Sequence, residues 1–154
     1  MIVGVPKELA AGETRVALTP VAAAQLTKNK LDVIVEYGAG TAAGFEDPAY
    51  AAKGARLAPR PELLAAADVL LQVNCLRADA PDIATLKPAA VLIGFADPLG
   101  TPQAMAALAA RGVSLLAIEL IPRITRAQAM DALSSQANLA GYKAVILAAH
   151  ASPK

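Results

Sequence analysis

Short runs of valine, isoleucine and leucine alternate along this chain with alanine- and leucine-rich stretches that keep a helical period. The runs are apolar almost without interruption, which is the pattern of strands that are covered on both faces. Strands that alternate with helices in this way form strand-helix-strand units around a largely parallel sheet. The pattern therefore predicts an α/β sandwich, and a length of 154 residues fits one domain with a buried core.

The expected elements can be bounded from the same pattern. The strands are expected at residues 2–5, 32–37, 69–73, 91–95 and 113–119, with a minor one at 56–57. The helices are expected at 20–29, 48–53, 61–67 and 102–110, with a weaker one at 81–86 and one long helix over about 125–150. Thr19, Asp47 and Thr101 each precede a helix that begins with proline, so we expect their side chains to cap these helices. Gly112 is expected to end a helix in a left-handed conformation, whereas Gly141, inside the last helix, should be offset by tight packing or a bend.

The charge and the rare residue types exclude several classes of function. The 14 basic and 13 acidic side chains nearly cancel and are scattered, so no basic stripe or aromatic platform is present to bind nucleic acid. Cys75 is the only cysteine and His150 the only histidine, which argues against a disulfide framework, a Cys/His metal site and catalysis with a histidine base. The start of the chain is typical of a first strand rather than of a secretory signal, and no apolar run approaches the length of a membrane span.

Three glycines, Gly38, Gly40 and Gly44, follow the second expected strand. Their spacing is G-x-G-x-x-x-G rather than the G-x-G-x-x-G of a dinucleotide-binding loop, and the next residues are typical of a turn before a helix. We therefore interpret this segment as a connecting loop in which glycine supplies positive φ angles.

Polar residues follow three of the expected strands at the end where parallel strands bring their carboxyl termini together. Lys7, Glu8 and Arg15 follow the first strand, residues 72–75 end a central one, and Asp97 follows its neighbour. Open α/β sheets bind ligands at this edge, so the sequence favours a cleft there, although solvated charges near turns would give the same pattern. Cys75, directly after an apolar strand, is expected to be a small half-buried filler rather than a nucleophile.

The densest group of polar side chains lies between the last strand and the last helix. Arg123, Gln128, Asp131 and Ser134 bring together a cation, an amide, a carboxylate and a hydroxyl, and the last three recur at a spacing that places them close to one helical face. The set offers donors and acceptors but no strong base, so it suits the positioning of a neutral amide, a ribose and a pyrophosphate. The alternative is structural, namely a helix cap at Thr125 with solvated charges around it.

The segment 122–145 closely resembles the Arg-Gln-Asp loop and the following helix of NAD(H)-binding components (alpha subunits) of proton-translocating NAD(P) transhydrogenases. The segments Gly4-Val-Pro-Lys-Glu, Glu13-Thr-Arg-Val-Ala-Leu-Thr-Pro and Glu36-Tyr-Gly-Ala-Gly resemble the same family and its relative, alanine dehydrogenase. Alanine dehydrogenases carry a lysine near residues 72–74 and a histidine near 94–97, and this sequence has neither. The resemblance therefore favours the transhydrogenase branch.

This resemblance implies a flavodoxin-like or Rossmann-like three-layer sandwich, with a mostly parallel sheet and a long carboxyl-terminal helix, as an amino-terminal domain over residues 1–150. Residues 151–154 would begin a linker to a Rossmann domain that holds most of NAD(H). Arg123, Gln128 and Asp131 would serve hydride transfer by orienting the nicotinamide, and these three together with Ser134 would contact the cofactor. NADP(H) would be bound on a partner component.

The resemblance also implies partners and a location. The partners would be the NAD(H)-binding second domain, the NADP(H)-binding and membrane components, and a second copy in a homodimer of the complete protein, with no nucleic acid. The location would be cytoplasmic, at the inner face of the plasma membrane through partner subunits. Two alternatives stay open: the amino-terminal domain of an alanine or lysine-pathway dehydrogenase, and a non-enzymatic flavodoxin-like binding module.

Overall fold

A computed structural model describes residues 1–75 and 82–152, and the chain divides into two compact units, Met1–Ala117 and Ile118–Lys154. The first unit holds a six-stranded sheet in the order β3-β2-β1-β4-β5-β6, in which all neighbouring strands are parallel. The strands are β1 (Ile2–Val5), β2 (Asp32–Glu36), β3 (Arg56–Ala58), β4 (Val69–Asn74), β5 (Val91–Phe95) and β6 (Ser114–Ala117). The strand predictions are confirmed, with small differences at the strand ends.

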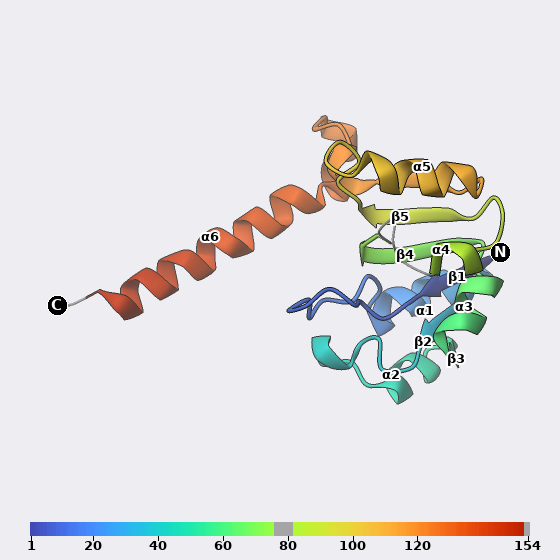
Figure 1. Ribbon diagram of the computed structural model, residues 1–154. Helices are drawn as coiled ribbons and strands as arrows, with labels where there is room; N and C mark the ends of the chain where they lie inside the picture. The colour runs from blue at the N-terminus through green and yellow to red at the C-terminus, as the bar shows by residue number, and fades with distance from the viewer. Residues whose placement is uncertain (76–81, 153–154) are drawn as a thin grey trace. The chain divides into compact units, whose positions relative to one another are not determined.

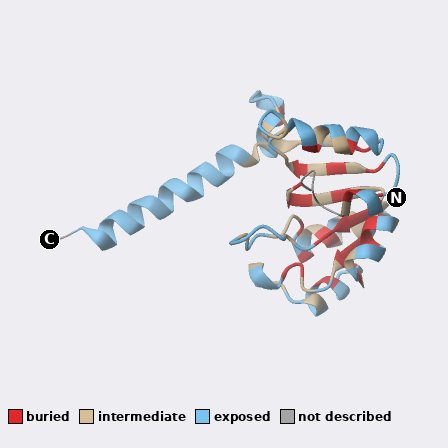
Figure 2. Cartoon of the chain, in the orientation of Figure 1, coloured by how far each residue is buried: buried red, intermediate tan, exposed pale blue. Residues whose placement is uncertain are grey.

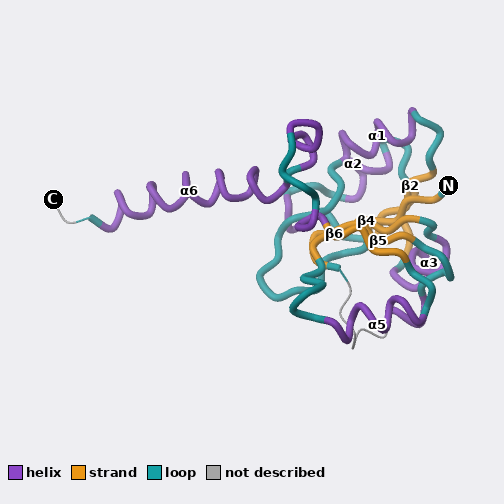
Figure 3. Tube along the Cα trace, turned by 90° about the horizontal axis from the view of Figure 1, so that it is seen from above, coloured by secondary structure: helices purple, strands orange, loops and turns teal. Residues whose placement is uncertain are grey.

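Helices lie on both faces of the sheet, which confirms the three-layer sandwich (Figure 1). They are α1 (Pro20–Lys28), α2 (Asp47–Ala51), α3 (Arg60–Ala66), α4 (Asp82–Thr85) and α5 (Pro102–Ala110), with a 3-10 turn, η1 (Thr41–Ala43), before α2. Helices α1 and α2 lie on one side of the sheet, and α3 and α5 lie on the other (Figure 3). Pro81, where the weakest predicted helix begins, lies outside the described residues.

Each face of the sheet has its own hydrophobic core. Val35 of β2 and Tyr50 of α2 are fully buried on the side of α1 and α2. Leu70 of β4 packs with Leu63 of α3 and Leu108 of α5 on the other side. The carboxyl ends of β1, β4 and β5 are thereby held together at one edge, where the polar loops begin.

The predicted helix cap was right at Thr19 and wrong at Thr101 and Asp47. The hydroxyl of Thr19 accepts from the amide of Ala22 at 3.3 Å, which confirms the cap of α1. Thr101 does not cap α5, because its hydroxyl instead donates to the carbonyls of Ala96 and Asp97, at 3.1 and 2.9 Å. These two hydrogen bonds stabilise the loop after β5 and not the start of α5.

The glycine loop after β2 behaves as a connecting loop. Gly38 and Gly44 have φ angles of 69° and 84°, as expected for glycine in the left-handed region, and Gly112 ends α5 at 73°. Asp47 does not cap α2 as predicted, because it is already the first residue of that helix. Its carboxylate accepts from the amide of Gly38 at 2.8 Å and so closes the loop.

The second unit contains two 3-10 turns, η2 (Ile118–Leu120) and η3 (Thr125–Met130), followed by the long helix α6 (Ala132–Ala151). The long helix is confirmed, but the prediction that it starts at Thr125 was wrong. Asp131 has φ −77° and ψ 82°, so the backbone leaves the helical region there and α6 starts after it. The boundaries of the predicted domain over 1–150 and linker over 151–154 stay a prediction.

Helix α6 is exposed along its length (Figure 2). A Cβ on Gly141 would meet nothing within 4 Å, so the packing that was expected to offset this glycine is not found among the described residues. No helix in the described part of the chain is long and apolar enough to cross a membrane.

Candidate functional site

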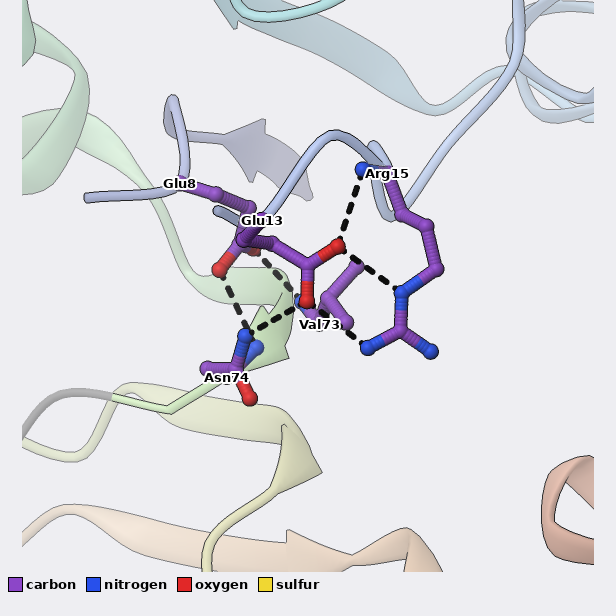
Figure 4. A network of polar contacts seen from close by, with 5 residues as sticks. All are labelled: Glu8, Glu13, Arg15, Val73 and Asn74. Carbon is purple, nitrogen blue, oxygen red and sulfur yellow. Dashed lines mark hydrogen bonds and ion pairs between the residues drawn. The ribbon is translucent and has the colours of Figure 1, made fainter. Parts of the chain in front are cut away.

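Glu8 closes the carboxyl edge between β1 and β4 (Figure 4). Strand β4 continues beyond the residues that pair with β1, and its register with β5 shifts between Leu71 and Asn74, which marks a β-bulge. The amides of Val73 and Asn74 donate to the two carboxylate oxygens of Glu8, at 2.6 and 3.1 Å. Strand β1 does not pair with Val73 and Asn74, and the carboxylate of Glu8 accepts the hydrogen bonds from their amides instead.

Glu13 joins the loop after β1 to the end of β4 through its side chain. Arg15 donates to it from Nε at 2.8 Å and from Nη2 at 2.7 Å, and Asn74 donates from Nδ2 at 2.9 Å. The hydrogen bonds from Arg15, opposed by partial burial, lower the pKa of Glu13 from 4.5 to about 2. The amide of Asn74 is oriented as well, because only its nitrogen can donate to a carboxylate.

Replacing Glu8 with alanine is expected to lower the free energy of unfolding by about 2 kcal/mol, because the amides of Val73 and Asn74 lose a charged acceptor at a part-buried bulge. The control is Glu62→Ala, which removes an ion pair with Arg56 between side chains that are 52% and 53% exposed, and should cost less than about 1 kcal/mol. Urea denaturation measures both values, and similar losses in the two variants would contradict the role given to Glu8.

The depressed pKa of Glu13 predicts a pH dependence of stability. A carboxylate whose folded pKa lies below its unfolded value stabilises the fold above the unfolded value and loses this contribution as pH falls through the folded one. The difference in unfolding free energy between the parent and Glu13→Gln should thus be constant above pH 4.5 and shrink as pH falls to about 2. Denaturation curves at a series of pH values measure it, and a difference that does not change with pH would show that Glu13 is not held as described.

The bulge itself depends on close contact with β5. A Cβ on Gly94 would lie 2.3 Å from the backbone oxygen of Gln72 and 2.9 Å from the sulfur of Cys75. Gln72 is 5% exposed, and among the described residues no donor reaches its Oε1. Cys75 belongs to the hydrophobic core on the side of α3 and α5, in agreement with a filler, although it is more deeply buried than predicted.

Arg60 forms a second group of ion pairs at this edge, and its role was not predicted from the sequence. Its guanidinium pairs with Glu36 at 2.9 Å and with Asp82 at 2.7 Å, and it donates to the backbone oxygen of Lys7 at 2.9 Å. The amide of Lys7 also donates to Glu36 at 2.7 Å. Arg60 follows Pro59 at the start of α3, and no local pattern indicates that it reaches acidic partners so far away in the sequence.

The predicted convergence at the carboxyl edge is therefore realised in part. The structure brings Glu8, Arg15 and Asn74 together, as expected from the ends of β1 and β4. Asp97 is exposed, and its carboxylate accepts from the amide of Gly100, at 3.2 Å, within its own loop. The described hydrogen bonds of this network join its residues to one another, which accounts for the order of the edge without a ligand.

The other predicted group lies in the second unit. Arg123 precedes η3 and Gln128 is within it, and both side chains are exposed. The N-cap position of η3 is occupied by Ile124, and no side chain caps this turn, so the alternative of a helix cap at Thr125 was wrong. The loop thus leaves the guanidinium of Arg123 and the amide of Gln128 exposed, and no described side-chain hydrogen bond involves either of them.

Asp131 and Ser134 have a different setting. The carboxylate of Asp131 accepts from the amide of Ser134 at 3.0 Å and from its hydroxyl at 2.6 Å, so Asp131 is the N-cap of α6. These hydrogen bonds from Ser134 lower the pKa of Asp131, and the charge of Arg123 adds to them. The prediction that Gln128, Asp131 and Ser134 share one helical face was wrong, because Asp131 separates η3 from α6.

Comparison with known proteins gives a consistent result. Residues 4–140 match the family model described as alanine dehydrogenase/PNT, N-terminal domain. NAD(P) transhydrogenase subunit alpha of Haemophilus influenzae is 44% identical over 150 residues, which cover 97% of this chain and 29% of that protein. Alanine dehydrogenase of Bacillus subtilis is less similar, at 32% identity over 97% of this chain and 38% of its own length.

A solved structure has the same fold. The crystal structure of transhydrogenase from Sinorhizobium meliloti superposes with a TM-score of 0.94 at 42% identity, over 100% of this chain and 46% of that chain. This chain therefore spans less than half the length of each of these relatives.

Proposed function

Because this chain belongs to the family of alanine dehydrogenase/PNT amino-terminal domains, we propose that it orients NAD(H) for hydride transfer within a proton-translocating NAD(P) transhydrogenase. Its relatives support membership of the transhydrogenase alpha subunits, which are more similar to it than the alanine dehydrogenase is. The observation that carries the proposal is the loop that contains Arg123 and Gln128. Both side chains are exposed, and the loop follows a parallel α/β sheet of the family's fold.

The donor set of this loop fits the nicotinamide end of NAD(H). The guanidinium of Arg123 offers donors only, and the amide of Gln128 offers both a donor and an acceptor, which matches a neutral carboxamide and a ribose. Asp131 and Ser134 hold the start of α6 and so fix where the loop ends. In the proposal all four residues contact the nicotinamide end, with Arg123, Gln128 and Asp131 most important for the transfer.

The contribution of this chain to the reaction is orientation. NAD(H), when bound, supplies or receives the hydride, and the second domain holds most of the cofactor. A residue that limits the angle and distance of approach converts the transfer into a reaction between groups already in place, which is among the largest effects available to an enzyme. None of the four loop side chains acts as a base or nucleophile in this account.

The proposal includes partners and a location. NADP(H) is bound on a separate component, a membrane component couples the transfer to proton movement, and the complete protein is a homodimer. The chain then lies on the cytoplasmic side of the plasma membrane and is held there by these subunits. The relative from Rhodospirillum rubrum is named as one portion of a divided alpha subunit, which supports a complex of several components.

Oxidative deamination of alanine is the second candidate, since alanine dehydrogenases belong to the same family. Residues 72–74 of β4 contain no lysine, and residues 94–97 contain no histidine, so the lysine and histidine of that family are absent. Reduction of NAD that depends on alanine, by a complete protein carrying this chain, would restore this candidate.

The isolated chain is expected to bind NADH no more tightly than about 1 mM, equivalent to about 4 kcal/mol, because the proposal assigns most cofactor contacts to another domain. Isothermal titration of the 154-residue chain with NADH measures it. Micromolar binding would show that the main cofactor site had been assigned to the wrong domain.

A further inference from the structure

The arginines of the two units have different settings. Each described arginine of the first unit donates to a carboxylate or to a backbone oxygen; these are Arg15, Arg56, Arg60 and Arg111. Arg123 and Arg126 of the second unit are exposed, and neither forms a hydrogen bond or an ion pair with a described residue. Two unpaired guanidinium groups therefore lie within four residues of each other, in the loop that the proposed function uses.

The acidic side chains of the second unit do not neutralise this pair. Glu119 and Asp131 are the only acidic residues between Ile118 and Lys154. The carboxylate of Asp131 accepts from the amide and the hydroxyl of Ser134, and one carboxylate oxygen of Glu119 is buried. A local excess of positive charge therefore remains on the loop, and such an excess attracts an anionic group.

The turn η3 places Arg126 on a different face from Gln128. A 3-10 helix has three residues per turn, so neighbouring residues point about 120° apart around its axis. Ala127, which lies between the two in sequence, is 5% exposed and is the only buried residue of η3. Arg126 and Gln128 therefore lie on the two faces that flank the buried one, and a group that contacts Gln128 leaves Arg126 available to another.

We propose that Arg126 pairs with a carboxylate on the NADP(H)-binding component and so determines how fast that component docks. This inference rests on the proposed function, in which the nicotinamide of NAD(H) lies against this loop and NADP(H) is held on a separate component. Transfer requires the reacting atoms to lie about 3 to 3.5 Å apart, so that component must come close to the loop. An exposed cation beside Gln128 is then at or near the surface where the two components meet.

A carboxylate fits Arg126 better than a cofactor phosphate does. The proposed function assigns most contacts with NAD(H) to the second domain and NADP(H) to its own component, so both sets of phosphates are held elsewhere. A guanidinium forms two parallel hydrogen bonds with a carboxylate. Charges near the rim of an interface act mainly on the rate of association and on its dependence on salt. The expected signature of Arg126 is therefore kinetic and sensitive to ionic strength.

The test measures docking in a complete alpha subunit that carries this chain as its first domain, with the NADP(H)-binding component produced separately. Stopped-flow mixing gives the association rate constant at ionic strengths of about 0.01 M and 0.1 M, where the screening length falls from about 30 Å to about 10 Å. Arg126→Glu should slow association by about tenfold or more at the lower ionic strength, and its difference from the parent should shrink at the higher one. Arg126→Lys, which keeps the charge, should recover most of the rate.

The control is Lys53→Glu, the same change of charge at an exposed position of the first unit. It should change the association rate by less than about twofold, because it lies outside the loop. The affinity of the alpha subunit for NADH, measured by titration, should be the same in Arg126→Glu and in the parent.

Three results would overturn the proposal: equal association rates in Arg126→Glu and Lys53→Glu, slow association that does not respond to ionic strength, or a loss of NADH affinity in Arg126→Glu with docking unchanged. The last result would assign Arg126 to a phosphate of NAD(H). Gln128→Asn separates this inference from the proposed function, because its hydride transfer is measured after docking is complete. Slow docking of Arg126→Glu together with unchanged transfer in Gln128→Asn would contradict the proposed orientation of NAD(H) and leave the docking role of Arg126 intact.

Discussion

Gly94→Ala is expected to lower the free energy of unfolding by about 3 kcal/mol or more. The added Cβ would lie 2.3 Å from the carbonyl oxygen of Gln72 and 3.1 Å from its carbonyl carbon. These are backbone atoms of β4, held by the bonds of the bulge to Glu8, so they cannot rotate away as a flexible side chain would. Relief requires β4 and β5 to separate.

Gly141→Ala is the matched control, with the same added methyl group and the opposite expected sign. A Cβ at Gly141 meets nothing within 4 Å, and the residue lies inside α6. Alanine there should stabilise the helix by up to about 1 kcal/mol, since glycine is a poor helix former. Urea denaturation followed by circular dichroism measures both variants, and a mild effect of Gly94→Ala would contradict the close contact at the bulge.

Gln128→Asn, in a complete transhydrogenase that carries this chain as its first domain, is expected to slow single-turnover hydride transfer by one to two decades. The substitution keeps the amide and shortens its reach by one methylene, and a misplacement of about 1 Å can cost on the order of a hundredfold in rate. Arg123→Ala should act in the same direction through loss of the cation. NADH affinity should change much less, because other contacts hold most of the cofactor.

The control for this prediction is Gln103→Asn, the same substitution at an exposed position of α5. It should leave the rate of hydride transfer unchanged, and the melting temperatures of Gln128→Asn and Arg123→Ala should stay near that of the parent because both side chains are exposed. Unchanged transfer rates together with lower melting temperatures would show that the loop has a structural role only.

The sheet could be predicted from the sequence because its signal is local. Strands of a parallel sheet leave continuous apolar runs, and β1 and β5 were bounded correctly from such runs alone, although alternate residues of β5 are only partly buried. The site at the carboxyl edge follows from topology, since loops after parallel strands meet at one edge; Glu8 and Asn74 were singled out on this ground. The bonds between them could not be predicted, because they depend on a register shift in β4.

The start of α6 shows the limit of periodicity. Residues 125–150 keep an apolar pattern without proline, which predicts one helix. The carboxylate of Asp131 instead accepts from the amide of Ser134, which favours a helix start directly after Asp131. Arg60 shows a second limit, since its partners Glu36 and Asp82 lie 24 and 22 residues away along the chain. The positions of Arg123 and Gln128 were expected from the family resemblance, and their role stays a prediction.

The rate of hydride transfer in a chimaeric enzyme tests directly whether this chain orients NAD(H) for a transhydrogenase. In the chimaera this chain replaces the matching segment of the Haemophilus influenzae alpha subunit, to which it is 44% identical. We expect transfer from NADH to NADP⁺ within about tenfold of the unmodified enzyme, a difference of about 1.4 kcal/mol in activation free energy, and no reduction of NAD⁺ by alanine. A folded chimaera that binds NADH but transfers no hydride, or one that reduces NAD⁺ only with alanine, would contradict it.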